Sequence, residues 1–176
     1  HKTELGGVIL NIPDRTSLAA AVDDIRTTAA PHLPAGEVPR ILVTPMVEAV
    51  GEVMIGYRHD PQVGPLVLLA PGGIAAEFSE ERVVRAAPVA PDEATFMVAE
   101  VRSLSAMTGF RGGAVADFPA LVRAIVDLSR IGELDGPRIV EAEINPLRLR
   151  ERRVGAVAVD AVVRVVQEEG SSPTRR

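Results

Sequence analysis

The chain has 176 residues, of which 47% are apolar, enough for one domain with a real core, and no apolar run approaches the ~20 residues of a membrane span. Its 24 acidic and 19 basic residues give a net charge of -5 and aromatic residues make up only 3%, so the basic surface and stacking groups of a nucleic-acid-binding protein are missing. The lack of cysteine excludes disulfides, thiolate-bound zinc and thiol catalysis, and residues 1–4 precede no signal-type apolar block, so we expect a cytoplasmic protein with neither nucleic acid nor membrane as a partner.

The first half of the chain is predicted to contain one helix among short strands. Residues 6–12 form a mostly apolar run that is typical of a strand. Capping-type residues then precede apolar residues at helical spacing, which predicts a helix over about 15–29. Three β-rich segments separated by turn-forming residues follow, and we expect them to form an antiparallel meander over residues 40–46, 52–58 and 65–69.

The second half is predicted to contain helices that cover the sheet. After a strand over about 83–87, apolar residues at spacings of three to four predict two amphipathic helices, which begin near Asp92 and near Asp117. Two β-rich runs around a polar turn follow, over 138–150 and 154–163. We therefore expect an α+β fold, a mainly antiparallel sheet covered by helices, in one domain over residues 1–166 with a flexible tail over 167–176.

The last two β-rich runs are predicted to form an acidic hairpin. Polar and apolar residues alternate over 140–145, so a strand places Glu143 and Asn145 on one polar face. A four-residue connection and a two-residue connection give the same register, which sets Glu143 opposite Asp160 and Asn145 opposite Ala158. The pattern therefore gathers three oxygen-bearing side chains at one place.

Two interpretations of this hairpin remain open from the residues alone. Two carboxylates opposite each other are destabilising unless a charge compensates them, and carboxylate and amide oxygens suit Mg²⁺, which leaves its other positions to phosphates and water. The metal interpretation therefore predicts a nucleotide site. The alternative is a solvated polar face neutralised by the arginines of the turn.

Four motifs occur in one order along nearly the whole chain. They are His-Lys-Thr-Glu-Leu-Gly-Gly-Val at residues 1–8, Asp-Pro-x-x-Gly-Pro at 60–65, Gly-Phe-Arg-Gly at 109–112, and Glu-Ile-Asn-Pro-Leu at 143–147, the last followed by a strand that ends Val-Ala-Val-Asp-Ala at 157–161. In this order they resemble the ATP-grasp domain of NDP-forming acyl-CoA synthetases, the family of succinyl-CoA synthetase β subunits and ADP-forming acetate-CoA ligases. The resemblance begins partway into that domain, so the first lobe has no counterpart here.

The resemblance implies roles for particular residues. Asn145 and Asp160 match the family residues that hold the Mg²⁺ of the nucleotide, with Glu143 as a supporting or water-mediated partner. The positions that resemble nucleotide-contacting positions are Thr44 and Met46 beside adenine, Glu52 on the next strand, and Arg85 and Arg111 beside phosphate. His1 resembles the histidine of a phosphoryl relay, for which neutral imidazole is a competent nucleophile.

The implied reaction is acid, CoA and ATP to acyl-CoA, ADP and phosphate through a phosphohistidine. The implied partners are the missing ATP-grasp lobe, a small carboxylic acid and the CoA-ligase domains or subunit that bind CoA, so this fragment alone should be inactive. A rival hypothesis is a non-catalytic regulatory module of a protein acetyltransferase. Ala70-Pro71 stands where the family has Gly-Leu before two glycines, and Val162 stands where it often has arginine; both departures bear on phosphate handling.

Non-functional explanations remain open for the individual residues. His1 fits a tag remnant or a polar loop residue as well as a relay histidine. Core packing accounts equally for Met46, and a solvated strand face for Glu52. For the two arginines, Arg85 and Arg111, surface salt bridges are the common fate.

Overall fold

The computed structural model describes residues 6–34, 36–73 and 80–166, and the predicted tail over 167–176 lies outside them. The chain divides into two compact units, His1–Val47 and Glu48–Arg176. Within the described ranges, no helix is both long and apolar enough to cross a membrane.

The first unit contains an α-helix, α1 (Arg15–Ala29), which continues into the short 3-10 helix η1 (Ala30–His32). Asp14 caps α1, because its carboxylate accepts a hydrogen bond from the backbone N–H of Ser17 at 2.8 Å. That bond also lowers the pKa of Asp14. The helix predicted over 15–29 is therefore confirmed.

The strands predicted over residues 6–12 and 40–46 are wrong. Both segments lack regular secondary structure, and the side chain of Leu42 is 85% exposed. A strand needs a neighbour to pair its backbone N–H and C=O groups, and the described residues of this unit contain no such neighbour. A β-rich composition is therefore not sufficient to make a strand here.

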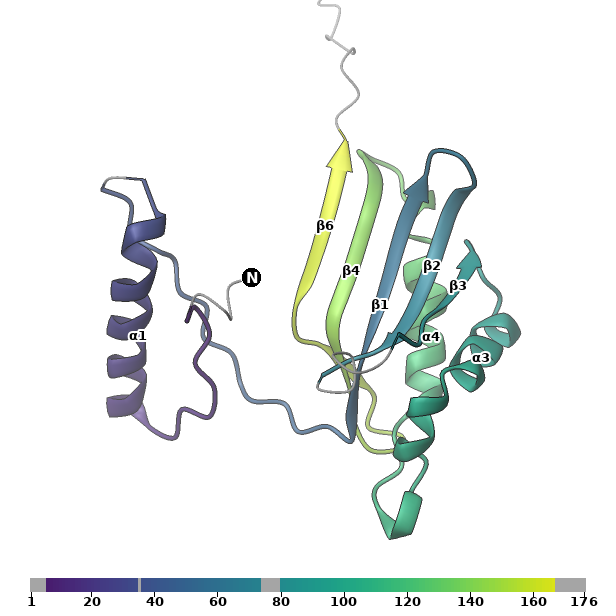
Figure 1. Ribbon diagram of the computed structural model, residues 1–176, viewed down its shortest axis with the longest axis horizontal. Helices are drawn as coiled ribbons and strands as arrows, with labels where there is room; N and C mark the ends of the chain where they lie inside the picture. Colours follow the sequence, from purple (N-terminus) through teal and green to yellow (C-terminus); the bar gives the residue numbers. More distant parts are fainter. Residues whose placement is uncertain (1–5, 35, 74–79, 167–176) are drawn as a thin grey trace, which may run out of the picture. The chain divides into compact units, whose positions relative to one another are not determined.

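The second unit is built on an antiparallel sheet of six strands in the part of the chain that the structure describes (Figure 1). The strand order is β3-β2-β1-β4-β5, and β6 also pairs with β4. The strands are β1 (Gly51–Asp60), β2 (Gly64–Pro71), β3 (Val83–Ala86), β4 (Arg138–Leu149), β5 (Ala156–Ala158) and β6 (Ala161–Val166). The α+β fold with a mainly antiparallel sheet is confirmed.

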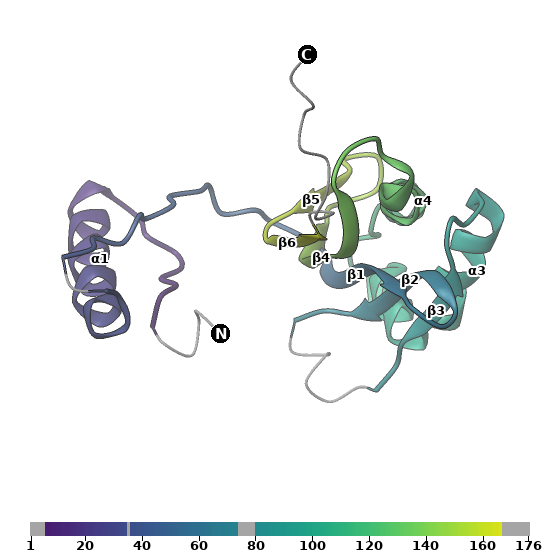
Figure 2. The ribbon, with the colours of Figure 1, turned by 90° about the horizontal axis from the view of Figure 1, so that it is seen from above.

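Helices cover one face of this sheet. The helices of the second unit are α3 (Pro91–Glu100), α4 (Phe118–Ser129) and the 3-10 helices η2 (Arg102–Met107), η3 (Phe110–Gly112) and η4 (Ile131–Glu133). Figure 2 shows α3 and α4 on the same side of the sheet. Since α4 packs against β1, β2 and β4, it covers the central strands of the sheet.

The core lies between α4 and the sheet. Fully buried side chains from both layers meet there, among them Ile55 and Leu69 from the sheet and Leu121 and Ile125 from α4. Each such side chain stabilises the fold by roughly 1.5–3 kcal/mol relative to exposure. Because strand residues alternate between faces, β1 buries every second side chain and turns the others to the opposite, more polar face.

The register predicted for the acidic hairpin is wrong by two residues. Glu143 pairs with Val162, and the backbone N–H of Asn145 donates to the carbonyl of Asp160 at 3.0 Å. The cause is the turn, which closes between Arg150 and Gly155 and so begins and ends later than predicted. A shift of two residues keeps every side chain on its predicted face, so the hairpin still has the predicted polar face.

Candidate functional site

An irregularity in β4 sets the position of Asn145. Between two paired rows of the sheet, β1 advances two residues, from Val53 to Ile55, while β4 advances three, from Ile144 to Leu147. The extra residue lets both ends of β4 bury apolar side chains in the same core although their spacing is odd. Asn145 lies at this bulge and is exposed on the sheet face away from the helices.

Asn145 and Asp160 lie opposite each other at the break between β5 and β6. In addition to the bond from the N–H of Asn145, the N–H of Val159 donates to the carbonyl of Pro146 at 3.1 Å, which holds the break against β4. The side-chain amide nitrogen of Asn145 donates to a carboxylate oxygen of Glu143 at 3.2 Å. The structure therefore places Asn145 beside Glu143 and opposite Asp160, in a register that differs from the predicted one. The role of the three residues as metal ligands stays a prediction.

The donor set of this cluster fits a hard cation. The parts of the chain that the structure describes hold no group of three His, Cys, Asp or Glu side chains, so the cluster rests on two carboxylates and one amide. With its nitrogen committed to Glu143, Asn145 presents its carbonyl oxygen as the atom suited to a cation. Mg²⁺ takes one or two protein carboxylates and retains positions for phosphate and water, which matches this set.

Glu52 joins the same face from β1. Its carboxylate accepts a 2.8 Å ion pair from Arg148 on β4, and both side chains are about three-quarters covered, with exposures of 25% and 26%. Sequence reasoning missed Arg148, because strict alternation from residues 140–145 puts position 148 on the core face and only the bulge turns it to the polar one. The signal in the sequence was the position of Arg148 between Leu147 and Leu149, both of which are buried.

The loop after β2 packs directly on Glu52. The backbone N–H of Gly72 donates to the carbonyl of Glu52 at 2.9 Å, and a Cβ at Gly72 would lie 2.9 Å from backbone atoms of Glu52 and Val53. Gly73 has a φ of +63°, and its Cβ would lie 3.0 Å from a carboxylate oxygen of Glu52. Only glycine fits this close approach, so Gly72 and Gly73 lie directly against Glu52.

The two arginines predicted to meet phosphate lie elsewhere. Arg85 pairs across the sheet with buried Val67, so it lies on the helix side, where Glu93 and Glu100 of α3 form ion pairs with it. The hydrogen bond that Arg85 donates to Glu93, with smaller contributions from Glu100, raises the pKa of Arg85. Arg111 lies in η3 with a φ of +54° and belongs to none of the strands of the sheet. Neither adjoins Asn145 along the sheet.

The remaining predicted residues belong to the first unit. Thr44 and Met46 are exposed there, in a segment without regular structure. His1 lies outside the described residues. Their roles therefore stay predictions.

An antiparallel sheet with one face covered by helices and one open, polar face is the architecture expected of an ATP-grasp lobe. The family model described as an ATP-grasp domain matches residues 1–165, and the chain belongs to that family. The recognition made from the motifs is confirmed.

Its relatives include ADP-forming ligases. The chain is 32% identical over 161 residues to the β subunit of acetate-CoA ligase I [ADP-forming] of Pyrococcus furiosus, covering 92% of this chain and 68% of that protein. It is 32% identical over 151 residues to acetate-CoA ligase I [ADP-forming] of Archaeoglobus fulgidus, covering 86% of this chain and 22% of that protein. The chain thus spans under a quarter of the Archaeoglobus ligase.

Solved structures agree with this assignment. A crystal structure from Pyrococcus horikoshii matches with a TM-score of 0.83 and 28% identity, covering 94% of this chain and 70% of that one. An acetyl-coenzyme A synthetase of Ca. Korarchaeum cryptofilum, in complex with coenzyme A and Mg-AMPPCP, matches with a TM-score of 0.72 and 29% identity, covering 94% and 71%. At these identities the likeness extends beyond the fold to the sequence.

Proposed function

We propose that this chain is the Mg²⁺- and nucleotide-binding lobe of an NDP-forming acyl-CoA synthetase. The observation that carries the proposal is the placement of Asn145 and Asp160 opposite each other beside Glu143, on the open sheet face of an ATP-grasp lobe. The whole protein converts a small carboxylic acid, CoA and ATP to acyl-CoA, ADP and phosphate. ADP-forming acetate-CoA and 4-hydroxybutyrate-CoA ligases among the relatives support this reaction class.

The residues of the chain position the nucleotide. Asn145 and Asp160 hold Mg²⁺, which when bound neutralises phosphate charge. Glu143 orients the amide of Asn145 through their 3.2 Å hydrogen bond, and it meets the ion directly or through water. Glu52 holds Arg148 on the same face, and Gly72 and Gly73 pack closely against Glu52.

The other parts of the proposal rest on the resemblance. The segment with Thr44 and Met46 faces adenine, and His1 takes part in the phosphoryl relay to the CoA-ligase portion, which binds CoA. One structural neighbour is described with its phosphohistidine segment pointing towards the nucleotide site, which supports a relay on histidine. The rival hypothesis, a regulatory module of a protein acetyltransferase, gains no support from the relatives named here, which are CoA ligases or synthetases.

Mn²⁺ as a paramagnetic stand-in for Mg²⁺ tests the metal site in the 176-residue chain. With ADP present, Mn²⁺ should broaden the NMR signals of Asn145 and Asp160 before others, because broadening reports even weak binding. Asn145→Ala and Asp160→Asn should each weaken the effect about tenfold, since a charge-assisted contact contributes roughly 1.5–3 kcal/mol. Asp127→Asn, an exposed change on α4, is the matched control.

Equal broadening in all four proteins would refute the metal site. For the relay, the full-length parent protein is incubated with ATP labelled on its γ-phosphate. We expect acid-labile, base-stable label that is lost in His1→Ala. A parent protein that neither binds Mg-ATP nor takes up label would overturn the enzymatic proposal and favour a regulatory module.

A further inference from the structure

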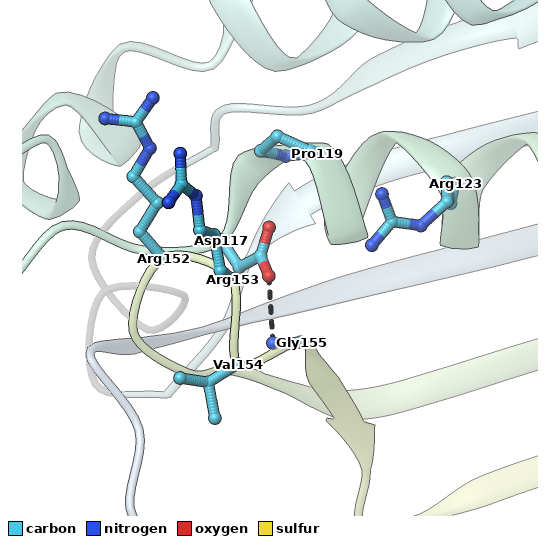
Figure 3. Close-up of a pocket in the computed structure, with 7 residues that line it drawn as sticks. All are labelled: Asp117, Pro119, Arg123, Arg152, Arg153, Val154 and Gly155. Carbon is cyan, nitrogen blue, oxygen red and sulfur yellow. Dashed lines mark hydrogen bonds between the residues drawn. The ribbon is translucent and has the colours of Figure 1, made fainter.

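A pocket of about 490 Å³ lies where the turn of the β4–β5 hairpin meets the start of α4 (Figure 3). Its charged lining residues are Asp117, Arg123, Arg152 and Arg153. Figure 3 shows Arg152 and Arg153 rising from the turn beside Asp117, while Arg123 extends from α4 toward the turn. The volume falls within the roughly 300–1,000 Å³ of small-molecule sites.

The buried carboxylate of Asp117 builds this pocket. Asp117 is 4% exposed, and one of its oxygens accepts from the N–H of Ala120 at 3.1 Å, which caps α4. The other oxygen accepts from the N–H of Gly155 at 2.9 Å, which ties the hairpin turn to the helix. The backbone N–H of Asp117 also donates to the carbonyl of Arg150 at 2.9 Å. The helix and the turn are therefore held in one arrangement.

The turn itself is fixed in a costly conformation. Arg153 has a φ of +70°, a region that side-chain-bearing residues adopt rarely and at a cost of about 1 kcal/mol or more. The N–H of Val154 donates to the carbonyl of Glu151 at 2.9 Å, and the N–H of Arg152 donates to the carbonyl of Val115 at 2.8 Å. These bonds set where the two turn arginines leave the backbone.

The three arginines are unpaired within the described residues. The side chains of Arg123, Arg152 and Arg153 form no ion pair or hydrogen bond there, in contrast to those of Arg85 and Arg148, which are held by glutamates. Asp117 contributes one negative charge, but backbone N–H groups occupy both of its oxygens. Three positive charges against one leave the lining with a net charge of +2. An anion is the compensating partner that this lining lacks.

We propose that this pocket binds a phosphate-bearing small molecule with at least two negative charges. Guanidinium forks match phosphate oxygens in pairs, and Arg123 lines the pocket from α4 while Arg152 and Arg153 line it from the turn. The site is separate from the metal cluster, because the Arg150–Gly155 row is five residues along β4 from the Asn145–Asp160 row, roughly 16 Å at 3.3 Å per residue. The proposal therefore does not rest on the proposed function.

Titration of the 176-residue chain with inorganic pyrophosphate, in chelator and without Mg²⁺, tests the site by calorimetry and NMR. We expect saturable binding that shifts the signals of residues 151–155 and of the start of α4. Arg123→Gln and Arg152→Gln should each weaken it about tenfold, because a hydrogen-bonded charge contributes roughly 1.5–3 kcal/mol. Arg130→Gln, exposed at the end of the same helix and outside the pocket, should leave it unchanged.

Two further arms separate the alternatives. Arg152→Lys keeps the charge but loses the fork, so it should bind less tightly than the wild type and more tightly than Arg152→Gln. Asn145→Ala should leave pyrophosphate binding unchanged, which distinguishes this pocket from the metal cluster. Competition by ADP would show that the pocket accepts a diphosphate group that is part of a nucleotide. Binding of inorganic pyrophosphate without competition by ADP would show that it accepts only the free diphosphate.

Three results would overturn the proposal. They are an absence of saturable pyrophosphate binding in the low millimolar range, equal losses in the Arg130 and Arg152 variants, and tighter binding of glutarate than of pyrophosphate. The last would assign the arginines to dicarboxylates. Because the substituted side chains are exposed, an unchanged amide spectrum outside the pocket confirms that each variant is folded.

Discussion

Replacing Asp117 should destabilise the second unit more than any exposed acidic change. The carboxylate is buried and makes two bonds to backbone N–H groups, at 3.1 Å to Ala120 and at 2.9 Å to Gly155. Asp117→Ala removes a helix cap, which costs about 1 kcal/mol, and leaves the N–H of Gly155 without its acceptor, which costs about 1–3 kcal/mol. The expected loss of unfolding free energy is therefore roughly 2–4 kcal/mol.

Asp117→Asn separates the two bonds. The amide oxygen still accepts from one N–H, but the amide nitrogen then faces the other as donor against donor. The expected loss is roughly 1–2 kcal/mol, about half that of the alanine variant. A graded series, wild type above Asn above Ala, is the signature of two separate bonds from one carboxylate.

Urea unfolding followed by tyrosine fluorescence measures this loss directly. Tyr57 is the chain's only tyrosine, there is no tryptophan, and Tyr57 is buried in the core of the second unit, so the signal reports that unit alone. With a slope of about 2 kcal/mol per molar urea, Asp117→Ala should lower the midpoint by about 1–2 M. Asp127→Ala, exposed on the same helix, should change it little. Equal midpoints for the two alanine variants would refute the reasoning.

Three more substitutions test the packing and a turn. Gly132→Ala would place a Cβ 2.0 Å from the hydroxyl oxygen of Tyr57, whose ring is buried. We therefore expect a loss of about 1–3 kcal/mol of unfolding free energy, measured by the urea midpoint. An unchanged midpoint would show that the ring moves freely. Gly72→Ala would place a Cβ 2.9 Å from backbone atoms of Glu52. The substitution should therefore displace residue 72 and weaken the NMR broadening by Mn²⁺-ADP. Intact broadening would count against a role for Gly72. Asp60 accepts from the N–H groups two and three residues on, and the first of these bonds does most to lower its pKa. A lowered folded pKa contributes stability that is present above the unfolded pKa and lost as the pH falls through the folded pKa. Asp60→Ala should therefore make the unfolding free energy depend less on pH on the acid side. Parallel curves of unfolding free energy against pH for the two proteins would contradict this.

Local signals in the sequence were sufficient for elements that depend on neighbouring residues. The helix over 15–29 carries its own cap and spacing, and the strands over 52–58 and 65–69 are joined by a short turn, so their pairing needs no distant information. The α+β class followed from these pieces. The helix that begins after Asp117 was found for the same reason, because its amphipathic spacing is local.

Long-range geometry was not available from the same signals. The register of the hairpin depends on where the turn closes, which involves the contact between Asp117 and Gly155 across 38 residues of sequence. The bulge at Asn145 depends on pairing with β1, more than 80 residues earlier. Arg148 was missed for that reason. Of the pocket arginines, those of the turn were interpreted only as neutralising the polar face of the hairpin, and Arg123 was given no role.

The sheet separates the groups that hold the fold together from those proposed to carry function. On one face, β1 and β4 supply buried apolar side chains to the core, and substitutions there remove buried area. On the other face, Glu143 and Asn145 are partly or fully exposed, and their mutual hydrogen bond is of a surface kind that contributes little to stability. Asn145→Ala should therefore weaken metal binding about tenfold with a change in unfolding free energy of less than about 1 kcal/mol. A large loss of stability with retained Mn²⁺ broadening would reverse this division and return the hairpin to a structural role.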